Sequence, residues 1–161
     1  MQSLIEQHGT VVFSDCERYR YALWREWEPE RGFVMFIGLN PSITPAEEDN
    51  ATIRRCVGFA QSWGYGGIAL TNLFACRADT PPLMLAEQAP IGPENDEWLQ
   101  KVASKADLIV GAWGNHGAHL GRSGIVRTLL APMHCLKVNK SGEPAHPLYQ
   151  PRGAQPVLLV R

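Results

Sequence analysis

Long apolar runs are missing from this sequence. No stretch reaches the length of about 18 consecutive apolar residues that a membrane-spanning helix needs. The segment 1–10 contains Glu6 and His8 where a secretory signal has a continuous apolar stretch. We therefore expect a cytoplasmic protein that does not contact a membrane.

A surplus of positive charge is missing as well. The chain has 15 Lys and Arg against 16 Asp and Glu, which gives a formal net charge of −1. Proteins that bind nucleic acid mainly through its phosphates usually carry a basic surplus. The composition therefore gives no support for tight, non-specific DNA binding, although it leaves a local basic patch open.

Closely spaced cysteines are the third absence. The four cysteines lie far apart and none belongs to a C-x-x-C pair: Cys16, Cys56, Cys76 and Cys135. This spacing disfavours an ordinary zinc ribbon, and single cysteines usually fill the core. We expect free thiols, no metal and no other cofactor.

What the sequence does contain is an alternation of continuous apolar runs and helical patterns along 161 residues. Such runs are typical of strands buried on both faces of a parallel sheet. We predict a single α/β domain over 1–161, with three αβα layers around a central, mainly parallel four-stranded sheet. The predicted strands cover 33–38, 67–72, 107–112 and 135–138, and the predicted helices cover 51–63, 93–106 and 119–130, with Asn50 as the N-cap of the first helix. Segments 10–13 and 18–26 predict a peripheral N-terminal hairpin, 156–160 an edge strand, and 73–93 a Pro-rich loop with one helical turn.

Polar residues follow the predicted strands, at the edge where open parallel sheets bind ligands. Asn40 lies in the first of these loops, Gly38-Leu39-Asn40-Pro41-Ser42. Gly38 permits a close backbone approach, and Pro41 favours an extended conformation of Asn40. The Asn40 amide either positions a water or a polar ligand, or closes an Asx-type turn.

The next two strand ends carry an amide, an indole and an imidazole. Asn72 either reads the amide-like edge of a base or caps the loop that follows it. Trp113 is either a stacking surface or a core residue. His116 is a candidate hydrogen-bond donor.

His146, beside Pro147 after the fourth strand, is a candidate to stabilise a developing anion. Asp49 is a candidate to orient a water or a sugar hydroxyl. Arg54 and Arg55, near a predicted helix start, are candidates to meet phosphate. The alternative for Asp49 and the two arginines is a solvated helix face and its cap.

Several motifs together resemble DUF1643, an uncharacterised bacterial and phage family whose name carries no activity. The resemblance covers roughly residues 18–150. It is carried by the sequence motifs at 38–42, 49–56, 63–67, 71–75, 92–96, 112–114 and 146–149.

The order of the motifs is also similar to that of the uracil-DNA glycosylase superfamily. Gly38-Leu39-Asn40-Pro41 matches its first loop, in the Asn form of the mismatch-specific branch. The strand ending in Asn72, the strand ending in Trp113-Gly114 and the loop at His146-Pro147 match its later motifs. The resemblance implies a uracil-DNA glycosylase-like fold, with water positioning by Asn40, base reading by Asn72 and carbonyl-oxygen stabilisation by His146.

Two departures from the superfamily change what the resemblance implies. Leu148-Tyr149 follows His146-Pro147, where the superfamily has Ser-Pro-Leu-Ser, so the Leu wedge that flips a base is not matched. Asn40 cannot act as a general base, so any hydrolysis depends on stabilisation of the leaving group.

We therefore expect a glycosylase-like hydrolase that cleaves the N-glycosidic bond of a base in a nucleic acid or a nucleotide. In this hypothesis Asn40, with Asp49, holds the attacking water, and His146 and Asn72 bind the departing base. Phe74 or Trp113 stacks on that base. The alternatives are a non-catalytic binder of a nucleotide or nucleic acid, and a partner-binding protein that uses the Pro-rich loop 78–93. The base, the strandedness of the substrate and the oligomeric state stay open.

Overall fold

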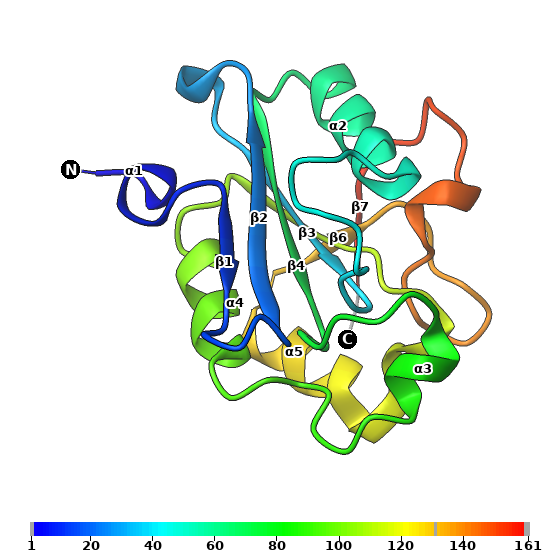
Figure 1. Ribbon diagram of the computed structural model, residues 1–161. Coiled ribbons are helices and arrows are strands. Elements are labelled where there is room, and N and C mark those ends of the chain that lie inside the picture. Colours follow the sequence, from blue (N-terminus) through cyan, green and yellow to red (C-terminus); the bar gives the residue numbers. More distant parts are fainter. Residues whose placement is uncertain (1, 131, 160–161) are drawn as a thin grey trace.

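The computed structural model describes residues 2–130 and 132–159, and within them one sheet of seven strands in the order β1-β2-β4-β3-β5-β6-β7 (Figure 1). The strands are β1 (Val11–Phe13), β2 (Arg20–Glu26), β3 (Val34–Gly38), β4 (Gly67–Asn72), β5 (Leu108–Gly111), β6 (His134–Cys135) and β7 (Val157–Leu158). The helices are α1 (Leu4–His8), α2 (Ala51–Ser62), α3 (Pro81–Leu85), α4 (Asn95–Ala103) and α5 (Arg122–Leu129), with 3-10 helices η1 (Pro29–Arg31), η2 (Asn115–Gly121) and η3 (Pro147–Tyr149).

The centre of the sheet is parallel and its margins are antiparallel. β3 pairs in parallel with β4 and β5, and β5 pairs in parallel with β6. β1, β2 and β7 add antiparallel pairs at the two sides. The prediction of a mixed α/β protein with a mainly parallel central sheet is therefore confirmed.

The predicted count of four strands is wrong, because the N-terminal hairpin is part of the main sheet. Leu23 to Glu26 of β2 pair with Leu70 to Gly67 of β4, which would otherwise be an edge strand with unpaired backbone groups. β7 covers β6 in the same way on the other side. The hairpin that the sequence placed at the periphery thus extends the sheet.

Apolar side chains fill both faces of the sheet, under different helices. On one face, which we call the α2 face, Phe36, Ile68 and Val110 pack against Cys56 and Phe59 of α2. On the opposite face α4 and α5 cover a larger cluster that includes Met35, Leu99 and Val126 (Figure 1). These two cores explain why the central runs are continuously apolar, since each strand is buried on both sides.

Two helices differ from the sequence prediction. The predicted helix 119–130 is in fact η2 followed by α5, because His119 and Leu120 have non-helical backbone angles and Leu120 has a φ of 56°. α1 was not predicted at all, although Ser3 and Glu6 form a capping box at its start. The structure thus has a sharp turn where η2 meets α5, close to the ends of the parallel strands.

β2 contains a β-bulge at Tyr21. Val12 of β1 is opposite Ala22, whereas its neighbour Phe13 is opposite Arg20, so one residue of β2 is skipped. Tyr21 and Ala22 consequently both belong to the core under α4 and α5. A bulge of this kind re-aims neighbouring side chains, and Arg20, directly before the skipped residue, lies on the α2 face.

No helix among the described residues is long and apolar enough to cross a membrane.

Candidate functional site

A cavity of about 760 Å³ opens at the carboxyl ends of the parallel strands, on the α2 face. We call it the strand-end cavity. The loop after β3 leads to α2 on one face, and the loop after β5 leads to α5 on the other, so the two loops diverge between neighbouring strands. Open α/β sheets bind ligands at such points, and the volume lies within the range of about 300–1,000 Å³ usual for small-molecule sites. The lining includes Arg20, Gly38, Leu39, Asn40, Pro41, Ser42, Asn50, Thr52, Asn72, Asp79, Trp113, His116, His146 and Tyr149.

Asn72 presents an unpartnered amide to this cavity. The residue is only 7% exposed, yet its side chain forms no hydrogen bond with any residue that the structure describes. Its backbone is firmly held: Asn95 Nδ2 donates to Asn72 O at 2.9 Å, and Arg122 Nε donates to Leu73 O at 2.8 Å. Since buried amides are nearly always hydrogen-bonded, the Asn72 amide is available to a ligand.

Gly38 gives Asn72 the room it occupies. The two residues are opposite each other in the parallel pair of β3 and β4. A Cβ atom on Gly38 would lie 2.8 Å from Asn72 Oδ1, which is closer than real Cβ contacts. A side chain at this position would therefore displace the amide.

Asn40 exposes its acceptor and uses its donors internally. Its Nδ2 donates to Ala78 O at 2.9 Å and to Pro41 O at 3.0 Å. These two bonds use both amide hydrogens and tie the Gly38–Ser42 loop to residue 78. Asn40 Oδ1 has no hydrogen-bond donor among the described residues, so it remains free to accept from a water or a ligand.

His146 is arranged as a neutral donor. Its Nδ1 accepts a hydrogen bond from Leu148 N at 3.2 Å, which places the proton of the neutral ring on Nε2. Burial lowers the pKa of the imidazole below its usual value, which favours the neutral form. The Nε2–H group has no partner among the described residues, and His146 lines the cavity.

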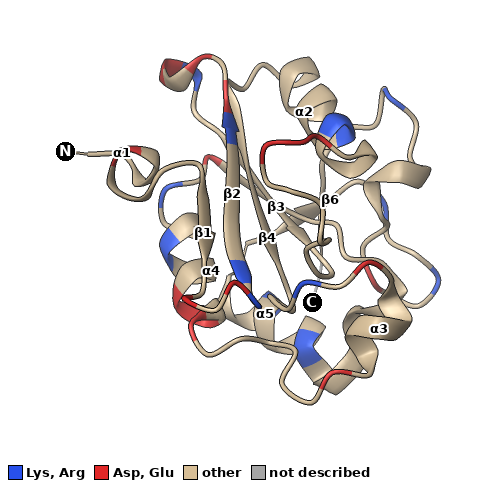
Figure 2. Cartoon of the chain, in the orientation of Figure 1, with Lys and Arg blue, Asp and Glu red and all other residues tan. Residues whose placement is uncertain are grey.

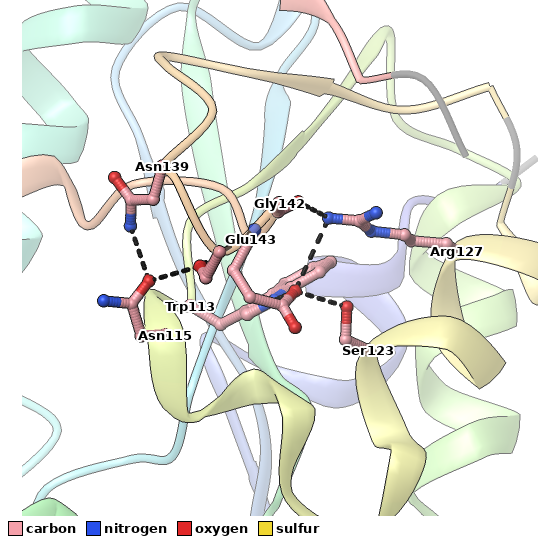
Figure 3. A network of polar contacts seen from close by, with 8 residues as sticks. Trp113, Asn115, Ser123, Arg127, Asn139, Gly142 and Glu143 are labelled. Carbon is pink, nitrogen blue, oxygen red and sulfur yellow. Dashed lines mark hydrogen bonds and ion pairs between the residues drawn. The ribbon is translucent and has the colours of Figure 1, made fainter.

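A buried network holds the loop that carries His146 against the loop that follows β5 (Figure 3). Glu143 accepts from Trp113 Nε1 at 3.0 Å and from Ser123 Oγ at 2.6 Å, and it pairs with Arg127 at 3.4 Å. Asn115 Oδ1 accepts from Asn139 and Ser141 of the same loop. The network therefore fixes the cavity wall that includes His116 and His146.

Two predicted stacking residues do not offer their rings to the cavity. Trp113 is 1% exposed, its indole packs against Gly111 and Gly117, and its Nε1 is engaged by Glu143. Phe74 is fully buried in the core under α4 and α5 and does not line the cavity. The sequence left open whether Trp113 stacks or packs, and the structure places its ring in the core.

Asp49, Arg54 and Arg55 also lie outside the cavity lining. Asp49 pairs with Arg25 at 2.9 Å. Arg54 and Arg55, together with Arg152, line a separate depression of about 700 Å³ along the outer side of α2, which we call the arginine groove. Ala51 and Leu148 line both hollows and separate them.

The structure adds residues that the sequence reading missed. Arg20 is buried in the cavity wall, Asn50 caps α2 there by accepting from Ile53 N, and Tyr149 stands at the rim with 82% of its surface exposed. The Asn50 cap was predicted, but not its place at the site. Tyr149 belongs to the motif that begins at His146, which was a usable signal. Nothing in the sequence marked the bulge that brings Arg20 here.

The described residues provide neither a reactive thiol nor a set of metal ligands at the site. Cys56 lines the cavity, but burial raises the pKa of its thiol far above the usual value, so it is a poor nucleophile. All four cysteines are free, as predicted. Within the described part of the chain, no group of three or more His, Cys, Asp or Glu side chains is placed to hold a metal ion.

A family model described as "Protein of unknown function (DUF1643)" matches residues 20–148, which is most of the chain. The comparisons of the chain with curated proteins and with solved structures found no match.

Proposed function

The chain belongs to the DUF1643 family, and from its strand-end cavity we propose that it hydrolyses the N-glycosidic bond of a base in a nucleotide or nucleic acid. One observation carries the proposal: Asn40 Oδ1, the Asn72 amide and His146 Nε2–H have no hydrogen-bond partner in the described part of the chain, and all three residues line one cavity. Their order in the chain resembles that of the uracil-DNA glycosylase superfamily, and a fold of that kind is part of the proposal.

The base occupies the part of the cavity next to Asn72 and His146. An amide supplies both a donor and an acceptor, which suits the paired donor and acceptor edge of a nucleobase. The neutral imidazole donates from Nε2 to a carbonyl oxygen of the base. This hydrogen bond strengthens as negative charge develops on the departing base, which is how a fixed donor lowers the barrier.

Water attacks the anomeric carbon from the side of Asn40. Asn40 Oδ1 accepts a hydrogen bond from the water and orients its lone pair. As the new C–O bond forms, the C–N bond breaks and its electron pair leaves with the base. The attacking water releases its proton to solvent, and the base takes up a proton from solvent. Because an amide is not a general base, the rate enhancement depends on His146 and Asn72.

Tyr149 is the aromatic side chain at the cavity rim and replaces Trp113 and Phe74 in the proposed stacking role. Its ring lies 5.7 Å from that of His146, at an interplanar angle of 52°. A ring in this position can cover one face of a bound base.

The test is release of free base, measured by chromatography. The panel contains nucleosides, their 5′-monophosphates, and single- and double-stranded oligonucleotides with uracil, hypoxanthine and alkylated bases. We expect release by the wild-type protein, a rate about 100-fold lower for His146→Ala, and an unchanged rate for the control Gln61→Ala on the outer side of α2. No free base from any member of the panel, with protein in excess over substrate, would contradict the proposal.

A second candidate is a binder of nucleotides without turnover, and the position of Asp49 favours it. The Asp49 carboxylate is held by Arg25 and lies outside the cavity lining, so it does not supply a base to activate water. This candidate predicts saturable binding of a panel member with no product formed. Binding of a panel member accompanied by release of its base favours the hydrolase.

A further inference from the structure

Arg20 is a buried cation for which the described residues provide no counter-ion. It is 5% exposed and lines the strand-end cavity, yet its guanidinium forms no ion pair or hydrogen bond with any described residue. Burial, together with the charges of Arg77 and Arg25, lowers its pKa to about 10, so it remains charged at neutral pH. An unpaired buried charge is costly to the folded state, and an anion in the cavity would remove that cost.

Arg122 is a buried arginine with a structural role, and its side-chain partners can be compared with those of Arg20. It is 2% exposed, its Nε donates to Leu73 O at 2.8 Å, and it pairs with Asp96. Arg20 has neither kind of partner among the residues that the structure describes, although it is almost as deeply buried. The difference indicates that the partner of Arg20 comes from outside the chain.

The bulge at Tyr21 is what turns Arg20 toward the cavity. If β2 alternated regularly, with no bulge, Arg20 would lie on the same face as Ala22 and Trp24, inside the apolar core under α4 and α5. A strand that bulges to keep a charged side chain out of that core and in the cavity is a feature often found beside binding sites.

The surroundings of Arg20 are also positive. Figure 2 shows positive charge near both ends of β2, where Arg18 pairs with Glu87 and Arg25 pairs with Asp49. Arg77, whose charge reaches Arg20, is bound to the backbone oxygens of Glu17 and Ile43. Among the described residues that line the cavity, Asp79 is the one with a carboxylate, and it is exposed.

The start of α2 faces the same cavity. Asn50 Oδ1 accepts from Ile53 N, which leaves the N–H groups of Ala51 and Thr52 without a helical acceptor. The first turn of a 12-residue helix adds partial positive charge there. Arg20 and these N–H groups thus offer the two kinds of donor that bind phosphate.

We propose that Arg20 and the start of α2 bind a terminal phosphate of the cavity's ligand, so that the ligand is a nucleotide rather than a nucleoside. A guanidinium this deeply buried is reached by a group at the end of a ligand more readily than by a phosphodiester, whose chain continues on both sides. The inference rests on the proposed function for the base at the other part of the cavity, but the phosphate site stands on Arg20 itself.

The first test uses inorganic phosphate as the probe. Thermal unfolding is measured in increasing phosphate, against chloride at matched ionic strength, for wild type, Arg20→Met and the control Arg18→Met. Arg18 is an exposed arginine paired with Glu87, so its replacement changes the net charge equally. We expect a saturable rise in Tm for wild type and Arg18→Met and none for Arg20→Met.

Without phosphate, Arg20→Met is expected to be at least as stable as wild type, because it removes an unpaired buried charge and keeps an unbranched chain. Arg20→Lys, which keeps the charge, provides a second variant. An equal saturable rise in Arg20→Met and wild type would overturn the proposal.

The second test compares uridine, adenosine and their 5′-monophosphates by calorimetry. We expect each monophosphate that binds to do so about 30-fold or more tightly than its nucleoside, and this preference to disappear in Arg20→Met. Equal binding of nucleoside and monophosphate, or no binding of either monophosphate, would overturn the inference.

The two proposals fail separately. Release of base without any Arg20-dependent preference for phosphate would remove the phosphate site and leave the hydrolase. Arg20-dependent phosphate binding without release of base would leave the phosphate site and remove the hydrolase.

Discussion

Asn72 and Asn95 are buried asparagines near the end of β4 that use their amides differently. Asn95 donates to Asn72 O and Leu73 O at 2.9 and 3.1 Å, and it is fully buried. The amide of Asn72 is bonded to nothing among the described residues and lies in the cavity. One amide therefore holds the strand end, and the other is free to meet a ligand.

We predict that Asn72→Ala weakens ligand binding and leaves the free energy of unfolding within about 1 kcal/mol of wild type, because no hydrogen bond is lost. Asn95→Ala should lower the free energy of unfolding by about 1–3 kcal/mol, because two buried carbonyls lose a donor. Urea unfolding and calorimetry measure the two effects. The assignment fails if Asn72→Ala destabilises the protein as strongly as Asn95→Ala does.

His146 should make stability depend on pH in one direction. Burial lowers the pKa of the folded imidazole, whereas the unfolded value is the ordinary 6.5. The unfolded chain therefore takes up a proton first, and stability that is complete above pH 6.5 is lost as the pH falls toward the folded pKa.

The comparison is with His146→Asn, whose side-chain oxygen can still accept from Leu148 N. Urea unfolding between about pH 5 and 8 should show a smaller loss of stability on acidification for this variant than for wild type. The other histidines are present in both proteins and cancel in the difference. Identical pH dependence in the two proteins would be evidence against a buried neutral His146.

At the scale of residues, the sequence predicted the site residues that follow strands. It did not predict Arg20, which lies inside a strand and lines the cavity because of a bulge. Asn40, Asn72 and His146 follow apolar runs, and parallel strands end at one edge. The burial of Trp113 was undecidable because an indole after a strand has the same sequence signal whether it packs or stacks. Arg20 lies inside the predicted strand 18–26, and the bulge changes the face on which regular alternation would place its side chain.

At the scale of elements, the loop between β6 and η3 depends on Glu143. This side chain is nearly buried and joins Trp113, Ser123 and Arg127. Gly114 N also donates to Pro144 O at 2.9 Å, which attaches the loop to the end of β5. His146 follows only three residues later, so its position depends on these contacts.

We predict that Glu143→Ala lowers the free energy of unfolding by about 2–4 kcal/mol, since it leaves buried donors and the Arg127 charge unpaired. It should also weaken ligand binding through His146. Glu143→Gln keeps an acceptor for Trp113 and Ser123 and should recover most of the stability. Urea unfolding of the three proteins checks this order, and equal destabilisation by the two variants would rule it out.

The elements with strong local signals were predicted closely. β4 coincides with the predicted strand 67–72, and α2 begins after its predicted cap. β6 is only two residues long against a predicted four, because strand length at the side of a sheet depends on what pairs with it. The turn inside the predicted helix 119–130 requires a positive φ at Leu120. A leucine gives no sequence signal for this conformation, because residues other than glycine rarely adopt it.

At the scale of the whole molecule, the cavity lies where the loops after β3 and β5 leave these neighbouring strands toward opposite faces of the sheet. The alternation of strands and helices predicted the parallel centre, but pairing between distant segments decides how many strands join it. The same pairing brings Arg20, from the N-terminal hairpin, to a site built from loops up to residue 149. Local pattern contains no information about such a contact, so the cation of the site could not be predicted.

The central claim is that Asn40, Asn72 and His146 bind one ligand together. The most direct measurement is an NMR titration of isotope-labelled protein with the nucleoside or 5′-monophosphate that raises the Tm most, following the two side-chain amides and the imidazole. The account predicts that all three signals shift with a single Kd, while the exposed Gln61 amide, which lines neither hollow, does not. Three signals that stay unchanged, or that move with different constants while the residues of the arginine groove respond, would contradict it.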